Sequence, residues 1–307
     1  MNNVQQSPQA VVMVRPHYFS PNPETAKDNV FQQDVDLSLS TINTKAFTEV
    51  NNAIDTLRSH GIEVHVFDDE TTKTPDSVFP NNWFTTHENG AIGIYPMYCH
   101  NRRKEINLNI IDFLAQNYVV NRLIDYSSYA EKGQFLEGTG AMVLDHENRL
   151  AYAVKSNRMS DDMLNNFAQD FNYTPIIFNA SDENGVPVYH TNVLMCIASQ
   201  FAMISLDMIK DNAEKAHVIK SLNASNKEII DLSLEQIKQF AGNALELKGP
   251  NGNILAISQT AYNALTDEQI LQIENYTKIV AIDVSTIELA GGSIRCMLAG
   301  IHLPKST

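Results

Sequence analysis

Three residues that lie far apart in the sequence have the side chains needed for nucleophilic thiol chemistry. Cys296 ends the segment GGSIRC, His190 lies in VYHTN, and Glu137 lies in FLEGTG. In such chemistry a thiolate is the nucleophile, an imidazole exchanges its proton, and a carboxylate orients the imidazole. Each residue also has an ordinary structural role, because a free cysteine is most often a small buried hydrophobe. The elements that carry the three residues therefore determine whether they meet.

A pattern that recurs about every 50 residues supplies such elements. Each unit opens with small or polar residues and continues into an apolar, strand-like segment. In the first four units a short or polar link, such as HENG, DHENR or KGPNGN, leads into a second strand. The period-two alternation is imperfect, which indicates strands that are buried on both faces. The units begin at Asn81, Gly138, His190, Gly242 and Gly291.

Helical segments lie between these strand pairs. They have apolar residues at helical spacing, and several begin with Ser, Thr or Asp or end at Gly, which are typical helix caps. A short apolar segment, such as EVHVF, TPIIF or IVAID, follows a helix. The expected helices cover residues 43–61, 102–117, 160–172, 233–242 and 266–277.

The repeated unit is therefore strand–strand–helix–strand. Radial repetition of such units closes into a propeller and protects the edges of its small sheets. We predict an α/β fold, a five-bladed α/β propeller of ββαβ units around a central site, with the helices outside and residues 1–307 in one domain. In such a ring the openings of equivalent units converge near the axis. That convergence would bring Cys296, His190 and Glu137 together.

Charge and composition limit the partners of the chain. The formal net charge of -14 argues against nucleic acid and anionic membranes, which attract clustered Lys and Arg. No signal peptide and no apolar run of membrane-spanning length is present, so we expect a cytoplasmic protein. The three cysteines contain no close pair, so neither a disulfide framework nor a zinc site is indicated. We predict no metal and no cofactor.

The other cysteines and most other histidines have ordinary structural interpretations. Cys99 and Cys196 lie inside apolar segments and are expected in the core. Of the nine histidines, only His190 opens a unit. The following histidines lie in helix or turn contexts and are expected at the solvated surface: His60, His65, His87, His100, His146 and His217.

Several segments, taken together, are specific for one known family. They are MVRPHYFSPNPETAKDNVFQ, DSVFPNNWFTTH, PMYCHNRRKE, FLEGTGAMVLD, VKSNRM, VYHTNVLM, FAGNALEL and GGSIRCMLAGIHLP. On these segments, over nearly its whole length, the sequence resembles the arginine deiminase and amidinotransferase superfamily and, within it, the branch of citrulline-utilisation hydrolases. The resemblance implies the pentein fold, in which five strand–strand–helix–strand units surround a central site.

The resemblance also implies covalent catalysis on the carbon of a guanidino or ureido group. Cys296 would attack that carbon and His190 would protonate the leaving nitrogen. His190 would then activate water against the thio-linked intermediate, and Glu137 would orient His190. This chemistry needs no metal. Members of the superfamily often form oligomers, so the resemblance allows a homo-oligomer, but the sequence does not indicate an interface.

Other residues match substrate contacts of the family. Arg158, in a Ser-Xaa-Arg element, would meet the α-carboxylate of an amino-acid substrate, because an Arg fork binds a carboxylate bidentately. Arg102 or Arg103 is a second candidate for that contact. Asp76 lies where relatives contact the α-amino group, and Phe79 of the same segment is a further candidate substrate contact.

Two departures from the family pattern concern the substrate head group. Arginine-using members place a carboxylate at the position of Asn82, and many place one at the position of Asn192. A guanidinium buried against two neutral amides would be costly, whereas a neutral ureido group can bond to them. We therefore expect citrulline, cleaved to ornithine, ammonia and carbon dioxide. The alternatives are a deiminase or a dimethylarginine dimethylaminohydrolase, an amidinotransferase, and a non-catalytic propeller that senses an amino acid.

Overall fold

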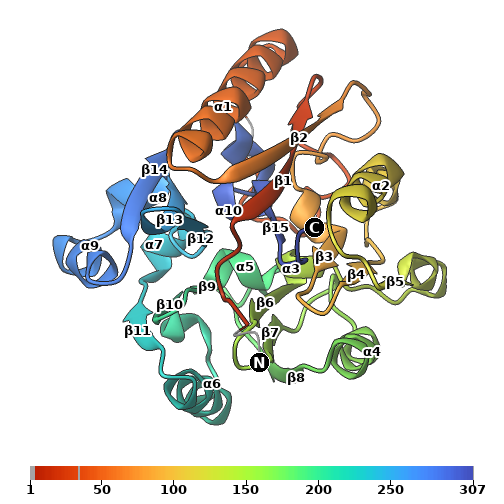
Figure 1. The fold of residues 1–307 in the computed structure, drawn as a ribbon. Helices are drawn as coiled ribbons and strands as arrows, with labels where there is room; N and C mark the ends of the chain where they lie inside the picture. The colour runs from red at the N-terminus through yellow and green to blue at the C-terminus, as the bar shows by residue number, and fades with distance from the viewer. Residues whose placement is uncertain (1–3, 34, 307) are drawn as a thin grey trace.

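The computed structural model describes residues 4–33 and 35–306, which form a ring of five three-stranded sheets (Figure 1). In each sheet the first strand pairs antiparallel with the second, and the second pairs parallel with the third. The sheets are β15 (Ala299–Ile301), β1 (Ala10–Pro16) and β2 (Glu63–Asp69); β3 (Phe84–Thr86), β4 (Ala91–Ile94) and β5 (Arg122–Asp125); β6 (Met142–Asp145), β7 (Leu150–Val154) and β8 (Thr174–Phe178); β9 (Met195–Ile197), β10 (Phe201–Ile204) and β11 (Glu228–Asp231); and β12 (Leu245–Gly249), β13 (Gly252–Ser258) and β14 (Lys278–Ile282).

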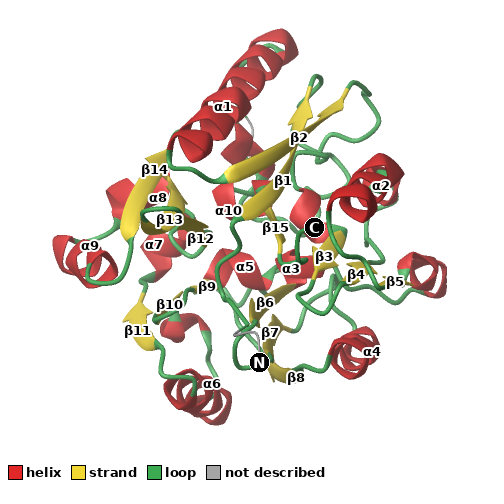
Figure 2. Cartoon of the chain, viewed as in Figure 1, coloured by secondary structure: helices red, strands yellow, loops and turns green. Residues whose placement is uncertain are grey.

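Helices join the parallel strands of each sheet and lie around the outside of the ring, with the strands inside (Figure 2). A parallel strand pair needs such a crossover, which explains the strand–strand–helix–strand order. The predicted five-bladed α/β propeller is therefore confirmed. The crossover helices are α1 (Leu39–Ser59), α2 (Leu108–Asn117), α4 (Asp161–Phe171), α6 (Asn212–Ala224), and the pair α8 (Gln259–Ala264) and α9 (Asp267–Glu274).

Two of the helix predictions need correction, and one helix was not predicted. The expected helix 102–117 is divided into a 3-10 turn, η2 (Arg102–Glu105), and α2, because the Asn107 side chain accepts a hydrogen bond from the backbone of Asn109 and caps α2. The expected helix 233–242 is the five-residue α7 (Leu234–Lys238). The sequence reading missed α6, which buries only Val218 and Leu222 and so has a weak apolar pattern.

The openings of four of the five units are short helical turns rather than the first residues of strands, which corrects the expected geometry. These turns are η1 (Pro80–Asn82), α3 (Gly138–Ala141), α5 (Thr191–Leu194) and α10 (Ile294–Met297). They lie close to the axis, where α3 packs against α5 and η1, and α10 packs against η1. The side chains at equivalent openings therefore meet, as the repeat predicted.

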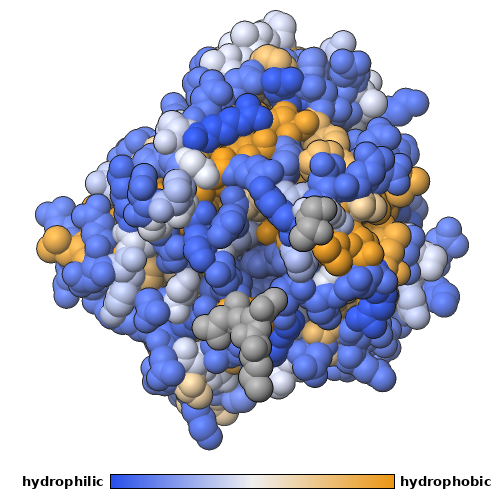
Figure 3. Space-filling model, viewed as in Figure 1, coloured by the Kyte–Doolittle hydropathy of each residue, from blue (hydrophilic) through white to orange (hydrophobic). Residues whose placement is uncertain are grey.

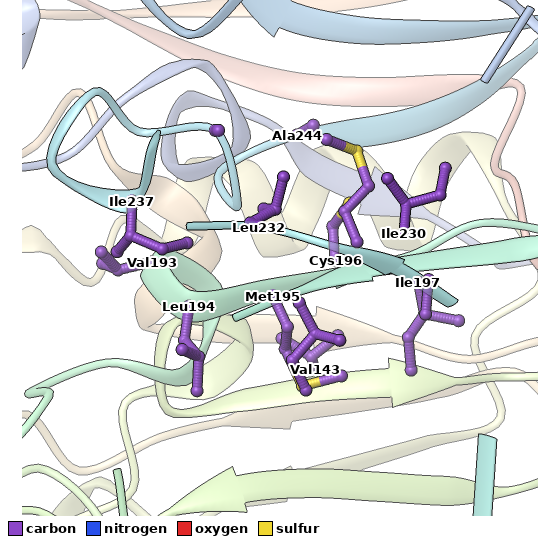
Figure 4. Packing of buried hydrophobic residues seen from close by; sticks show 14 of the residues in the cluster. Val143, Val193, Leu194, Met195, Cys196, Ile197, Ile230, Leu232, Ile237 and Ala244 are labelled. Atoms are coloured by element: carbon purple, nitrogen blue, oxygen red, sulfur yellow. The ribbon is translucent and has the colours of Figure 1, made fainter. Parts of the chain in front are cut away.

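The apolar core lies between neighbouring blades. Figure 4 shows part of it, where Cys196 of β9 packs with side chains that include Ile230 of β11 and Val143 of β6. Cys99 is buried as well, so both cysteines lie in the interior as predicted. His87 and His146, by contrast, were expected at the surface and are buried. Aromatic rings surround them, including Tyr173, which contacts both.

The ring closes where β15, the last strand, pairs with β1, the first. Thr86 of β3, in the next blade, joins this closure through its buried hydroxyl. The hydroxyl donates to the Gly300 carbonyl at 2.9 Å and accepts from the backbone N–H of His302 at 2.8 Å. One side chain thus satisfies two backbone groups of the closing strand region.

Thr86→Val should therefore destabilise the protein. The substitution keeps the shape of the side chain but leaves a partly buried carbonyl and N–H unpaired, which costs on the order of 1 kcal/mol. Urea denaturation measures the loss. Thr44→Val removes an exposed hydroxyl of α1 and should change stability by less than about 0.5 kcal/mol. Equal losses in the two variants would contradict the role of Thr86 in closing the ring.

Candidate active site

A small cavity lies on the axis where the unit openings meet. Apart from Arg103, all the predicted site residues line this cavity or hydrogen-bond directly to a residue of its wall. The wall also includes residues from the loop between β1 and α1. The lining residues are Thr25, Asn29, Asp76, Phe79, Asn82, Arg102, Arg158, Tyr189, His190, Ala290, Gly292 and Cys296.

The Cys296 thiol is buried on α10 and lies between two amides. Its Sγ accepts hydrogen bonds from Nδ2 of Asn192 and Nδ2 of Asn243, each at 3.2 Å. Donors of this kind favour negative charge on the atom that accepts them. The Asn243 side-chain oxygen is used by the backbone N–H of Arg295, whereas that of Asn192 is buried without a partner among the described residues. Asn192 thus holds a free acceptor beside the thiol.

His190 and Glu137 form a buried pair. Nε2 of His190 lies 2.7 Å from Oε2 of Glu137, and both side chains are almost fully enclosed. Burial lowers the pKa of His190 to about 4, and the Glu137 carboxylate only partly offsets this effect. His190 is therefore neutral near pH 7. Because a carboxylate can only accept, Nε2 carries the single proton and Nδ1 is left as a base.

Glu137 stays ionised in spite of its burial. Burial alone would raise the pKa of Glu137, but Arg158, His190 and Arg102 together lower it below its usual range. Nη1 of Arg158 lies 3.3 Å from Oε2, and the backbone N–H of Tyr98 donates to Oε1 at 2.9 Å. The carboxylate can therefore hold the tautomer and the orientation of His190 at neutral pH.

Gly140, in the EGTG segment, allows the unit openings to approach closely. A Cβ atom at this position would lie 2.7 Å from Cε1 and 2.8 Å from Nδ1 of His190, and it would overlap the side-chain amide of Asn82. Any other residue would push His190 or Asn82 away. The absence of a side chain at Gly140 thus sets how near these two groups come.

Asn82 faces the cavity but is engaged by its neighbours. In the amide orientation that satisfies the hydrogen-bond network, its oxygen accepts from Nη1 and Nη2 of Arg102 and its nitrogen donates to Asn81, each at 3.1 Å. The Asn82 amide therefore lies at the cavity wall with the positive guanidinium of Arg102 bound to its oxygen.

Arg102 lies inside the site and Arg103 outside it. Arg102 forms a bidentate pair with Glu105 and lies 3.7 Å from Asp76 and from Glu137. Burial raises the pKa of Glu105 to about 8 and also raises that of Asp76, although Arg102 opposes both shifts. Arg103 instead donates hydrogen bonds to two backbone carbonyls and does not line the cavity.

Arg158 is also buried, and a carboxylate occupies its fork. Asp28 accepts from Nη2 of Arg158 at 2.6 Å and from Nε at 3.3 Å, and the guanidinium lies over the Tyr189 ring at 4.8 Å. Asp28 belongs to the loop between β1 and α1, so this loop covers the cavity in the structure. A substrate carboxylate that takes the Arg158 fork has to displace Asp28.

The sequence reading missed the loop residues of the site. Asn22 donates to Asp76 at 2.7 Å, and Asn29 donates to the Ala290 carbonyl at 3.0 Å. Like Asp28, these residues precede the first predicted helix and belong to no repeated unit, so no equivalent position drew attention to them. Their segment, NPETAKDN, is densely polar and belongs to one of the family-specific segments, but neither feature assigned a role to these residues.

In the described part of the chain, no helix has both the length and the apolar character that a membrane span needs. Residues 4–33 and 35–306 also contain no group of three or more His, Cys, Asp or Glu placed to hold a metal ion.

A comparison with protein families identifies the family of this chain. Residues 15–303 match the family described as N,N dimethylarginine dimethylhydrolase, eukaryotic. The chain belongs to this family. It is thereby a member of the pentein superfamily and a hydrolase that acts on carbon–nitrogen bonds other than peptide bonds. No curated protein matches the sequence significantly.

Solved structures share the fold at low sequence identity. The cyanobacterial arginine dihydrolase ArgZ is 15% identical with a TM-score of 0.75, and the match covers 96% of this chain but 41% of ArgZ. The substrate-bound N-terminal domain of ArgZ gives a TM-score of 0.73 and is covered to 98%. DDAH from Pseudomonas aeruginosa, complexed with citrulline, is 13% identical with a TM-score of 0.63, over 96% of this chain and 99% of that one.

The protonation state of His190 can be measured directly. NMR titration of its Cε1–H should show no change of charge between pH 8 and pH 5, with a pKa of about 4. Glu137→Gln removes the carboxylate that raises this pKa, so the value should fall further. Glu131→Gln, on the exposed surface, serves as the control and should leave the titration unchanged. A midpoint near 6.5 would show that His190 is solvated and not held as described.

Proposed function

We propose that the protein hydrolyses a ureido amino acid through a cysteine nucleophile, with citrulline as the substrate and ornithine, ammonia and carbon dioxide as the products. The observation that carries the proposal is the position of the Cys296 thiol. It lies beside the amides of Asn192 and Asn243, in the same cavity as His190. Nucleophile, base and neutral head-group contacts are thus gathered in one buried place.

The first half of the reaction follows from the protonation states. Neutral His190 takes the thiol proton on Nδ1, and Sγ of Cys296 attacks the ureido carbon. The resulting oxyanion accepts hydrogen bonds from side-chain amides of the cavity. The carbon–nitrogen bond to ornithine breaks as His190 returns the proton to the leaving nitrogen, and an S-carbamoyl group remains on Cys296.

The second half hydrolyses this intermediate. His190, neutral again, takes a proton from water while the water oxygen attacks the carbamoyl carbon. The sulfur–carbon bond breaks and the proton passes to sulfur, which restores the thiol. The product carbamate decomposes to ammonia and carbon dioxide. Glu137 keeps Nε2 of His190 protonated throughout and stabilises the imidazolium when it forms.

The amino-acid end of the substrate would bind the buried charges. Arg158 offers a fork for the α-carboxylate once Asp28 has moved away. One oxygen of the Asp76 carboxylate has no partner among the described residues and is available to an α-ammonium group. Burial raises the pKa of Asp76, although Arg102 opposes the shift, and an ammonium partner would favour the ionised form.

The head-group contacts favour a neutral ureido group. Asn82 and Asn192 stand where arginine-using relatives place carboxylates, and Arg102 bonds to the Asn82 oxygen. A substrate guanidinium would therefore meet a cation behind Asn82 instead of an anion. The unpartnered oxygen of Asn192 can accept from a ureido N–H.

A second candidate is hydrolysis of arginine or a methylated arginine. The family match and the likeness to ArgZ and DDAH favour it, since those proteins are described as an arginine dihydrolase and a dimethylarginine hydrolase. The two candidates share the nucleophile, the base and the carboxylate contact. They differ in the charge of the head group that the cavity accepts and in the bond that breaks, because a dimethylarginine loses dimethylamine whereas citrulline loses ornithine.

Turnover across a substrate panel tests the proposal. We expect citrulline to exceed arginine and NG,NG-dimethylarginine in kcat/KM by on the order of tenfold or more, and agmatine to be poor because it lacks the carboxylate for Arg158. Release of ornithine, ammonia, citrulline and dimethylamine is measured, because hydrolysis of a dimethylarginine gives citrulline and dimethylamine. Rapid turnover of arginine without turnover of citrulline would favour the second candidate.

The nucleophile has its own test and matched control. Cys296→Ser should reduce turnover by on the order of a thousandfold or more and leave the folded state intact. Burial raises the pKa of Cys99 to about 12, so Cys99→Ser should retain activity and iodoacetamide should modify Cys296 rather than Cys99 near pH 7. Loss of folding in Cys296→Ser would point to a structural cysteine instead.

Head-group selectivity is tested by a matched pair of substitutions. Asn192→Asp and Asn243→Asp each remove one donor from the Cys296 sulfur, but only Asn192 has a free oxygen beside the thiol. We expect Asn192→Asp to shift the arginine-to-citrulline ratio of kcat/KM by on the order of tenfold toward arginine. Asn243→Asp should slow both substrates equally. Equal ratios in the two variants would remove Asn192 from the head-group contacts.

A further inference from the structure

A second cavity lies on the axis, in the part of the ring crossed by the N-terminal segment. Its wall includes Gln6 and Pro8 of that segment, together with Gly300, His302 and Arg295 of the C-terminal region. Figure 1 shows the N-terminal segment and the chain end near the centre of this face, and Figure 3 shows the same face hollowed near its centre among hydrophilic residues. The cavity has room for only a few water-sized groups.

Arg295 differs from the other arginines near the axis. Arg102 and Arg158 each reach two or more carboxylates. Arg295 forms no ion pair with a carboxylate of the described residues, and its only side-chain hydrogen bond donates from Nη1 to the Leu298 carbonyl at 3.0 Å. Most of its guanidinium N–H groups are therefore unused where the side chain lines the cavity.

Nothing in the cavity wall supplies the missing negative charge. The rings of His146 and His302 stack at 3.8 Å, and burial lowers the pKa of both, that of His302 to about 3, so both are neutral. Burial raises the pKa of the Cys196 thiol to about 12, so it is neutral as well. Thr86 and Gln6 contribute only uncharged groups, and these already bond within the protein. Arg295 is only partly exposed, and a guanidinium in a narrow cavity without a counter-charge attracts an anion.

The geometry points to a site for a small monovalent inorganic anion, such as chloride or bicarbonate, bound by the guanidinium of Arg295 in this cavity. The free N–H groups of Arg295 would donate to the anion, and the stacked imidazoles would form an uncharged wall beside it. The small volume excludes nucleotides and amino acids. The site is separate from the cavity that holds the Cys296 thiol, and its occupancy does not depend on the proposed reaction.

The anion would also act on Cys296. Arg295 and Cys296 are adjacent in the chain. Burial lowers the pKa of Arg295 to about 10, and a charge on Cys296 opposes this shift, as expected for a guanidinium and a thiolate that attract each other. Coupling of this kind is reciprocal. An anion that neutralises Arg295 therefore disfavours the thiolate and slows its reactions, which makes the second cavity an inhibitory site.

Thermal unfolding in sodium chloride, compared with sodium gluconate at equal ionic strength, tests binding without any substrate. Gluconate is too large for the cavity. We expect chloride to raise the Tm of the wild-type protein saturably, by on the order of 2 °C, and Arg295→Met to abolish the rise. Arg103→Met is the matched control, because Arg103 is half-buried and also bonds only to backbone carbonyls. It should keep the rise. Equal responses to both salts in the wild-type protein would overturn the proposal.

Alkylation of Cys296 by iodoacetamide gives a second measurement. Chloride should slow the reaction by on the order of threefold, with the same half-saturation as the Tm shift. Arg295→Lys retains the charge, so it should still respond to chloride even if Arg295→Met does not fold. A chloride response that survives in Arg295→Met, or that is missing from the wild-type protein, would show that Arg295 holds no anion.

Discussion

The buried carboxylate of Glu137 is the interaction on which the site depends. It accepts hydrogen bonds from His190, from Arg158 and from the Tyr98 backbone, and Arg102 lies within 3.7 Å. Removing one partner of such a cluster leaves buried charge uncompensated, which typically costs about 3–5 kcal/mol. The same carboxylate therefore holds together residues of several blades and fixes the tautomer of His190. Both the stability of the folded site and the protonation state of the base His190 therefore depend on the Glu137 side chain.

The ring supplies the geometry that this cluster requires. Four of the five blades begin with a short helical turn near the axis, and a turn presents its side chains within a shorter length of chain than a strand does. Gly140 has no side chain, so the turn at α3 comes close to His190 and Asn82. Convergence of turns, rather than of strand ends, is what places a thiol, an imidazole and a carboxylate from three blades together.

The parts of the site that repeat were predictable from the sequence, and the parts that do not repeat were not. Cys296, His190 and Glu137 occupy equivalent openings, so the period alone indicated that they meet. Asp28 lies in a loop that occurs once, and nothing in its pattern indicated that it would occupy Arg158. His146 stood in a turn-like segment, and its burial arises from Tyr173 and from His302, which the closure of the ring by the C-terminal strand brings against it. Closure of this kind joins residues that no local pattern relates.

Charge is distributed unevenly along the axis, and this bears on the choice of substrate. At the Cys296 cavity, Asp28, Asp76, Glu105 and Glu137 are shared between Arg102 and Arg158, while the groups nearest the sulfur are neutral amides. Beyond the sulfur lies Arg295 without a carboxylate partner. A substrate whose charges lie at its amino-acid end and whose head group is neutral matches this arrangement, in which charged side chains lie away from the sulfur and neutral amides lie beside it. A cationic head group would meet neutral amides at the sulfur and the Arg102 guanidinium behind Asn82, with no carboxylate of the described residues placed to balance its charge.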